Sequence, residues 1–130
     1  MHPHEAQIVR TFFVREKRER YLAMLGGSQR PKALGRLNHF HDLDERWSRI
    51  IESPTDVLSL LRELGALGTC YVLSDIPEID GRDMPLAEAI GIAEVGNWGT
   101  IIGCIPGKLA YYRGEASQHG TRRLLLERRR

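Results

Sequence analysis

The sequence predicts a single α+β domain over residues 1–130, in which a four-helix N-terminal half (residues 1–66) packs on a small, mainly antiparallel β-α-β-β-β sheet (residues 67–130). Apolar residues recur three or four positions apart in the first half, whereas runs of β-branched and aromatic residues dominate the second. A composition of 42% hydrophobic and 28% charged residues is typical of a globular protein and argues against a wholly disordered chain. A chain of 130 residues can bury a core without disulfides.

The first two helices are expected before residue 42. One runs from Glu5 to Leu25 and ends at two glycines, the residue that a helix C-terminus favours. Its charged stretch, residues 15–20, places Arg and Glu four positions apart, which is typical of a solvated helix face that pairs with itself. A basic stripe for nucleic acid is the alternative. A second helix is expected from Pro31 to about Phe40, because proline suits the first helical turn.

Two further helices are indicated by capping residues. Asp42 and Glu45 fit a capping box for a third helix, in which a short carboxylate covers free N–H groups. The apolar stripe of this helix consists of Leu43, Trp47, Ile50 and Ile51. A fourth helix is expected to open at residues 53–56 and to end at Gly65.

The C-terminal part is predicted to be rich in strands. Thr69–Ser74 is composed of β-formers and reads as a buried strand, followed by an acidic loop over residues 75–83 and a helix that starts at Pro85. Thr100–Ile105 and Leu109–Arg113 are expected as two strands of a hairpin. The turn between them, Pro106-Gly107, has the residues of a type II turn. A last strand is expected at residues 124–127, and residues 128–130 are expected as a frayed tail.

Charge is segregated along the chain, although the formal net charge is only +2. Residues 1–52 carry ten basic and seven acidic side chains, residues 53–96 carry two and eight, and residues 97–130 carry seven and two. The three segments therefore have net charges of +3, −6 and +5. This asymmetry can steer a charged partner, or the acidic middle can lie against the basic ends in the folded chain.

The sequence argues against a membrane-spanning protein and against a secreted one. No apolar run approaches the ~20 residues of a membrane span, and the N-terminal residues lack the layout of a signal peptide. We therefore expect a cytoplasmic protein without a membrane partner, and the excess of 16 Arg over three Lys favours a bacterial origin. The two cysteines, Cys70 and Cys104, are expected to be reduced and buried.

Histidines in the segment 38–44 are the first candidates for a metal site. His39 and His41 lie close in sequence, and histidine is a common zinc ligand in metal-dependent hydrolases. Side chains two residues apart diverge on a helix, so these two converge only in a loop or strand and need a distant ligand, such as His119 or Asp75. A helix corner with surface histidines is the alternative.

Carboxylates in the acidic loop are the second candidates. Asp75 and Asp80 follow a predicted strand, as the Mg²⁺ ligands of phosphoryl-transfer enzymes often do. Exposed turns are also rich in Asp and Gly, so an ordinary loop is the alternative. No cofactor is expected, and a bound divalent metal is the competing possibility.

The stretch from Gly103 to Leu109 contains the glycines and lysine of a phosphate-binding loop but fails its pattern. Three residues instead of four separate the glycines, Leu109 stands where Ser or Thr is required, and a strand follows in place of a helix. This excludes a nucleotide-binding loop. Cys104 could act as a nucleophile only if it were exposed beside a base such as His119, and its isoleucine neighbours favour a buried thiol.

Aromatic and arginine side chains in the C-terminal part favour a partner-binding face, because rigid rings and guanidinium groups anchor protein partners and also stack on bases. The candidate contact residues are Trp98, Lys108, Tyr112, Arg113 and Arg122. Tyr111 and Tyr112 point to opposite faces of their strand, so one is expected in the core and the other at the surface. Ordinary strand aromatics are the alternative.

The main functional hypothesis is a non-enzymatic binding or regulatory module that contacts another protein or a second copy of itself. The sequence contains no complete catalytic set, and its charge segregation favours a binding role. The basic first helix is a second candidate surface. A metal-dependent hydrolase acting on a phosphoester and a nucleic-acid-binding protein are the alternatives.

Overall fold

The structure, a computed structural model, describes residues 1–52 and 55–129 and confirms the α+β fold class. Over these residues it has five α-helices: α1 (Pro3–Phe12), α2 (Arg18–Leu25), α3 (Arg30–Arg36), α4 (Val57–Glu63) and α5 (Leu86–Gly96). It has six strands: β1 (Ser48–Ile50), β2 (Thr69–Ser74), β3 (Arg82–Pro85), β4 (Thr100–Ile105), β5 (Leu109–Arg113) and β6 (Arg123–Glu127). None of the helices in this described part is long and apolar enough to cross a membrane.

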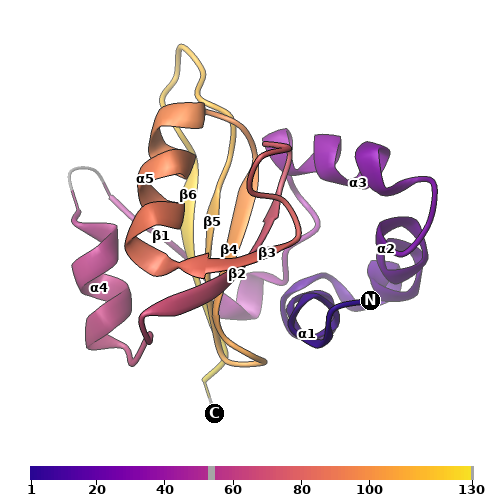
Figure 1. The fold of residues 1–130 in the computed structure, drawn as a ribbon, viewed down its shortest axis with the longest axis horizontal. Coiled ribbons are helices and arrows are strands. Elements are labelled where there is room, and N and C mark those ends of the chain that lie inside the picture. Colours follow the sequence, from indigo (N-terminus) through magenta and orange to yellow (C-terminus); the bar gives the residue numbers. More distant parts are fainter. Residues whose placement is uncertain (53–54, 130) are drawn as a thin grey trace.

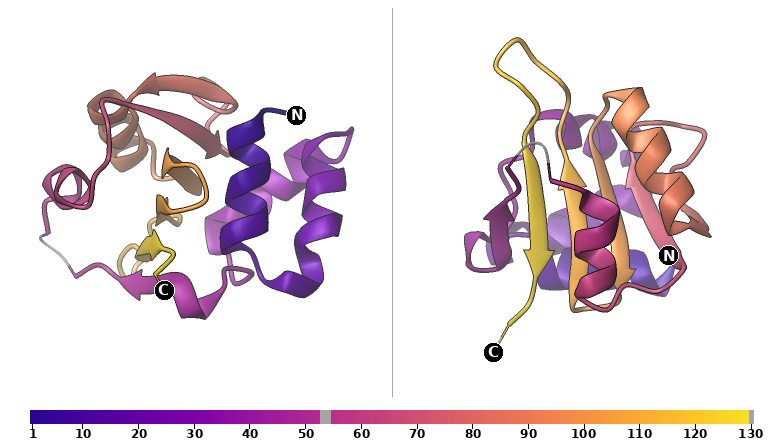
Figure 2. Two further views of the ribbon diagram at one scale, coloured as in Figure 1. Left: turned by 90° about the horizontal axis from the view of Figure 1, so that it is seen from below. Right: turned by 90° about the vertical axis from the view of Figure 1, so that its left-hand side faces the viewer.

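A single antiparallel sheet lies between two helical layers (Figures 1 and 2). Its strand order is β1-β6-β5-β4-β2-β3, and every pair is antiparallel. Helices α1, α2 and α3 cover one face, and α4 and α5 cover the other. Each layer encloses its own hydrophobic cluster, so alternating residues of the central strands are buried on both faces.

The first predicted helix is divided in two, which corrects the expectation of one helix from Glu5 to Leu25. Helix α1 ends at Phe12, and Phe13 adopts an extended conformation with φ −83° and ψ 153°. Phe13 forms an isolated antiparallel bridge with Leu43, flanked by backbone hydrogen bonds from Val14 to Asp42 and from Asp44 to Phe12. These long-range contacts bury both phenylalanines, which overrides the local helical preference.

The third predicted helix is absent from the structure. Residues 45–47 form a single 3₁₀ turn capped by Asp44, and β1 follows at once. Asp42 does not cap a helix, because its carboxylate instead accepts hydrogen bonds from Lys17 and Tyr21. The apolar stripe is also split: Ile51 is buried, whereas Ile50 is 69% exposed.

The later elements agree closely with the sequence. The β4–β5 hairpin has the predicted bounds, and Gly107 takes the positive φ of 71° that its type II turn requires. Asp56 caps α4 by accepting a hydrogen bond from the Ser59 amide, as expected, whereas residues 53–54 of the predicted opening lie outside the described residues. Strand β3 is not predicted by the sequence, because its residues fall in the expected acidic loop and at the expected start of the following helix.

Candidate functional site

Tyr112 and Arg113 lie in the interior, so the predicted face of Trp98, Tyr112 and Arg113 does not exist as a surface. Tyr112 is 0% and Arg113 5% exposed, whereas Trp98 is 47% exposed. Tyr111 is buried too, because helices cover both faces of the sheet, and the expectation that one of the two tyrosines would be exposed is wrong.

The Tyr112 hydroxyl and the Arg113 guanidinium have structural partners, although within the described residues Arg113 Nε has no hydrogen bond and instead lies 3.2 Å from Glu94 Oε2. The Tyr112 hydroxyl donates to the Leu37 carbonyl at 2.6 Å, which ties β5 to the residues after α3. The Arg113 guanidinium donates to the Ala93 carbonyl at 2.8 Å and to the Asn97 side chain at 3.0 Å. Arg113 therefore satisfies carbonyl groups at the C-terminal end of α5, where a positive charge is favourable.

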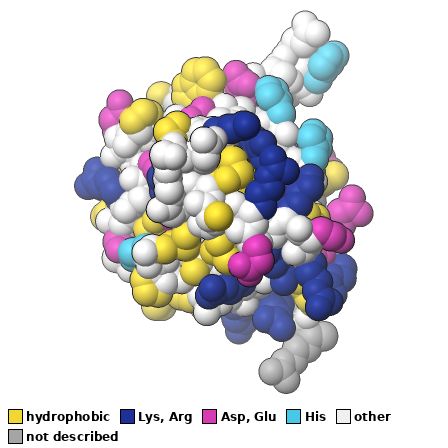
Figure 3. Space-filling view, turned by 90° about the vertical axis from the view of Figure 1, so that its right-hand side faces the viewer, with side chains coloured by type: hydrophobic (Ala, Val, Ile, Leu, Met, Phe, Trp, Pro, Cys, Tyr) yellow, Lys and Arg dark blue, Asp and Glu magenta, His cyan; other side chains and the backbone are white. Residues whose placement is uncertain are grey.

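The structure places the predicted metal ligands in two separate regions: the histidines line one hollow, whereas Asp75 and Asp80 make contacts elsewhere. His39 and His41 are exposed and line a hollow of about 300 Å³ with His119, Glu115 and Arg122. Within this hollow, the Nε2 atom of His39 lies 2.8 Å from Glu115 Oε2. Figure 3 shows histidine side chains near the top of the molecule, at the end where the β5–β6 loop projects in Figure 1.

Asp75 and Asp80 belong to other contacts. Asp75 accepts a hydrogen bond from Asn38 at 2.8 Å, and Asp80 forms an ion pair with Arg30. Within residues 1–52 and 55–129, no group of three or more His, Cys, Asp or Glu side chains is arranged to hold a metal ion. The geometry therefore lends no support to the predicted metal set, and metal binding stays an untested prediction.

Both cysteines are buried and free, as expected. Burial raises the pKa of Cys70 to about 12, and burial also raises the pKa of Cys104 to about 12. A thiol with so high a pKa remains protonated at neutral pH and is a poor nucleophile. The prediction that Cys104 is a buried structural thiol is confirmed.

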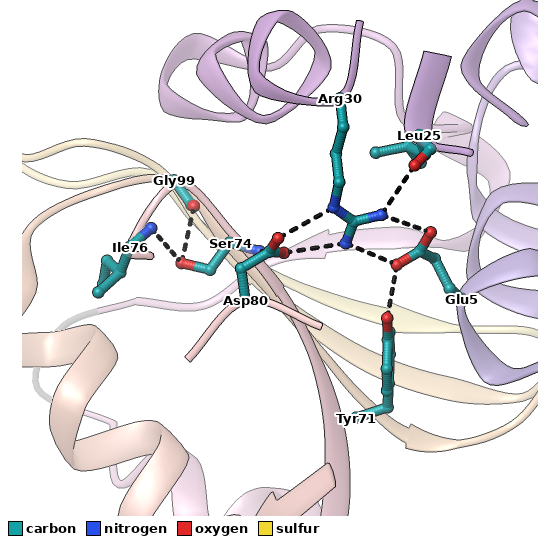
Figure 4. A network of polar contacts seen from close by, with 8 residues as sticks. All are labelled: Glu5, Leu25, Arg30, Tyr71, Ser74, Ile76, Asp80 and Gly99. Carbon is teal, nitrogen blue, oxygen red and sulfur yellow. Dashed lines mark hydrogen bonds and ion pairs between the residues drawn. The ribbon is translucent and has the colours of Figure 1, made fainter. Parts of the chain in front are cut away.

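A saturated ion network joins the N-terminal helices to the sheet (Figure 4). Arg30 donates from Nε and Nη2 to Asp80 at 3.0 and 3.2 Å, and from Nη1 and Nη2 to Glu5 at 2.9 and 2.8 Å. Its remaining donor reaches the Leu25 carbonyl at 3.0 Å, so all five N–H groups are satisfied. Tyr71 donates to Glu5 at 2.5 Å, and burial raises the pKa of this phenol, which keeps it protonated.

Contacts between the segments, one of them in this network, explain part of the charge segregation. The acidic middle segment supplies Asp80 to Arg30, Asp83 to His2, and Glu94 to Arg113, so basic and acidic segments of the chain meet in the fold. The interpretation that opposite charges pair internally is thus correct for Arg30 with Asp80 and for Arg113 with Glu94. Because the donors of Arg30 are used up, we regard the network as structural.

A cationic groove lies at the other end of the sheet, near the β4–β5 turn. It has a volume of about 840 Å³ and is lined by Trp47, Gly107, Lys108, Glu127, Arg128 and Arg129. Lys and Arg side chains gather at the lower right of the face that carries α1–α3 (Figure 3). This groove is the candidate functional site.

The register of the sheet creates the positive charge of the groove. Leu109 pairs with Glu127, and the Arg128 amide donates to the Lys108 carbonyl at 2.9 Å, so Lys108 and Arg128 are direct cross-strand neighbours. Side chains directly opposite each other in an antiparallel pair project on the same face. Strand β6 ends at Glu127, as predicted, and this one hydrogen bond ties Arg128 to the turn beyond the end of the strand.

An aromatic wall completes the groove. Trp47 is half-buried and packs against the cluster beneath α1–α3, while the Arg46 guanidinium lies 5.2 Å from the centre of its ring. The residues that line the groove thus include three cationic residues, one glutamate and one tryptophan. This arrangement can bind an anionic group and an adjacent apolar group at the same time.

No family model, curated protein or solved structure matches this chain.

Among the predicted partner-binding residues, Lys108 lies in the groove, Arg122 lies in the histidine hollow, and Trp98 lies in neither. Sequence reasoning missed Arg128 because it was assigned to an unstructured tail. The signal that could have found it was the hairpin turn: once the β4–β5 turn and the last strand are placed, antiparallel pairing brings Lys108 beside the end of β6.

Proposed function

We propose that this protein is a non-enzymatic binding module that recognises an acidic segment of a partner protein through the cationic groove. The observation that carries the proposal is the cross-strand placement of Lys108 beside Arg128, with Arg129 lining the same groove. Like charges directly opposite each other destabilise a sheet. An acidic partner relieves that repulsion, so the arrangement favours binding at the expense of stability.

The accessibility of these cations supports the proposal. Lys108, Arg128 and Arg129 are exposed, and within the described residues none of their side chains lies within 4.0 Å of a carboxylate. By contrast, Lys17, Arg30 and Arg46 are all held by carboxylates of the chain itself. The groove cations are thus available to a partner without first breaking an internal ion pair.

The groove favours an acidic protein segment over a nucleic acid. Glu127 stands in its wall, which opposes the continuous phosphate backbone of a nucleic acid but tolerates the spaced carboxylates of a peptide. Trp47 offers its half-buried ring to an apolar side chain between those carboxylates. A nucleic acid stays the alternative outcome of the test.

The test measures binding of a ten-residue peptide of alternating Glu and Val by fluorescence anisotropy at low salt. The double variant Lys108→Glu/Arg128→Glu should weaken binding by roughly 10- to 100-fold, because it reverses the charge that faces the ligand. The matched control is Lys32→Glu/Arg62→Glu, which changes the net charge equally at exposed positions on α3 and α4. The control should retain the affinity within about threefold, since distant exposed charges are screened.

An equal loss in both double variants would show that only net charge matters and would contradict a defined site. A single-stranded oligonucleotide serves as the competing probe. If it binds with a steep salt dependence while the acidic peptide does not bind, the nucleic-acid alternative replaces the proposal.

A further inference from the structure

Strand β1 is an open edge of the sheet next to the cationic groove. Among the described elements, β1 pairs only with β6 and stands at the end of the strand order. It lies at the margin of the sheet in both views of Figure 2. Trp47, which lines the groove, immediately precedes its first residue, Ser48. The groove and the open edge are therefore continuous along the chain.

The pairing of β1 leaves the backbone of Ile50 pointing outward. The Ile51 amide donates to the Arg123 carbonyl at 2.9 Å, which makes this a hydrogen-bonded pair of the antiparallel ladder. Such pairs alternate with non-hydrogen-bonded pairs, so Arg49 bonds to Leu125 whereas Ile50 and Leu124 do not bond to each other. The N–H and C=O of Ile50 consequently face the open side of the sheet.

The far side of β6 supports this parity independently. The Gly114 amide donates to the Arg122 carbonyl at 2.9 Å, and counting in steps of two along the register makes Leu124 a hydrogen-bonded partner of Tyr112 in β5. The backbone groups of Leu124 are therefore directed to β5 and away from β1. Both ladders give the same orientation for Ile50.

The side chains of β1 suit an acidic, partly apolar strand. Ile50 is 69% exposed, which is an unusual position for a large apolar side chain at a sheet edge. Arg49 is also exposed and adds a positive charge beside it. In a symmetric antiparallel pairing of two copies of β1 through Ile50, the two Arg49 side chains would lie diagonally opposite each other on one face. This like-charge contact disfavours self-pairing and favours a segment that carries carboxylates.

We infer that the acidic segment of the partner binds as an extended strand along β1, pairing with the outward N–H and C=O of Ile50 while its carboxylates reach the cations of the groove. This inference rests on the proposed function and specifies the conformation of the partner. Backbone hydrogen bonds supply affinity in this mode, and alternating side chains supply specificity. Because β1 is short, its backbone hydrogen bonds alone bind a partner strand weakly, and the charge contacts are needed as well. The short strand therefore also limits edge-to-edge aggregation of the free protein.

The direct test is amide hydrogen exchange, measured by NMR on the full chain with and without the alternating Glu/Val peptide. The Ile50 amide should exchange about tenfold more slowly in the complex, because it gains a hydrogen-bond acceptor. The Arg49 amide, already directed to β6, is the internal control and should change little. Binding that depends on Lys108 and Arg128 without protection of Ile50 would overturn the strand inference and leave the proposed function standing. Absence of any peptide binding would overturn both.

A pair of variants and a modified peptide provide the second test. Ile50→Pro removes the outward N–H and should weaken peptide binding by about tenfold, whereas Ile50→Thr keeps that N–H and the strand preference and should bind at least about threefold more tightly than the proline variant. A peptide of the same charge with proline at every second position cannot pair as a strand. It should bind the unaltered protein about tenfold more weakly than the original peptide, and equal binding of the two peptides would overturn the inference whatever the stability of the Ile50→Pro variant.

Discussion

The Arg30 network and the cationic groove use positive charge in opposite ways. In the network, one guanidinium is enclosed by two carboxylates and a carbonyl, and Glu5 is only 2% exposed. In the groove, Lys108 and Arg128 stand side by side and are exposed. The difference separates a charge cluster that holds the fold together from one that remains free for a ligand.

The electrostatic balance of the network depends on all of its members. Burying Glu5 costs solvation, and the two hydrogen bonds from Arg30 together with the one from Tyr71 offset that cost. Removal of one partner therefore leaves an uncompensated buried carboxylate. No such penalty attaches to the groove cations, because water already solvates them.

The largest effect is expected for Arg30→Met, which keeps the side-chain length but removes the charge. We expect a loss of about 3 kcal/mol in the free energy of unfolding, at the low end for a buried pair because Arg30 is 25% exposed in its side chain. Urea denaturation followed by circular dichroism measures it. Lys32→Met, an exposed position on the same helix, is the matched control and should change stability by less than about 0.5 kcal/mol. If both variants lost the same small amount, the network would not have the structural role assigned to it.

The strands that the sequence predicted with correct bounds are those that local residues define. β2 is bounded by Gly68 and Asp75, and the β4–β5 hairpin is specified by the Pro106-Gly107 turn. β1 could not be predicted, because its three residues form a strand only through pairing with β6, far away in the chain. The break after Phe12 likewise depends on a long-range bridge, the one between Phe13 and Leu43.

The same distinction applies to the candidate site. Lys108 can be identified from the sequence as a surface residue, because a turn residue between two clear strands is exposed. Its proximity to Arg128 follows from register, which no local pattern specifies. The Arg30 network was inaccessible for the same reason, because its residues come from α1, α3, β2 and the loop before β3. Paired charges at long range cannot be distinguished from solvated charges in a sequence.

A second prediction concerns His4, a titratable group beside the network. His4 lies 5.8 Å from the Tyr71 ring, and within the described residues its buried Nε2 has no hydrogen-bond partner. Burial and the nearby His2 lower the pKa of His4 below its ordinary value of 6.5, while Asp83 opposes the shift. The unfolded chain therefore binds this proton more readily than the folded chain. The resulting stability is complete above pH 6.5 and is lost as the pH falls below it toward the lowered pKa.

The unfolding free energy should accordingly decrease as the pH falls from neutral through 6.5. His4→Leu should flatten this dependence, whereas His41→Leu, at an exposed position, should leave it intact. Urea titrations at a series of pH values decide between them. A separate loss below about pH 4 should persist in both variants, because the hydrogen bond from Arg46 lowers the pKa of Asp44. An equal slope in the parent protein and in His4→Leu would refute the assignment to His4.

The smallest predicted effect is a change in the free energy of unfolding caused by substitutions at Lys108. Lys108→Glu replaces a like-charged cross-strand pair by a glutamate opposite Arg128, so the folded state should gain about 0.5 kcal/mol in the free energy of unfolding. The same substitution should weaken binding of the acidic peptide, because it removes a cation from the groove. Raising the salt concentration should reduce both effects, since the groove is open to solvent.

Lys108→Gln separates the loss of repulsion from the gain of attraction. It should recover about half of the stability gain, because it removes repulsion without adding attraction. A loss of stability in either variant would mean that Lys108 already contributes to the fold, and the contrast between a paired structural cluster and a free binding cluster would not hold.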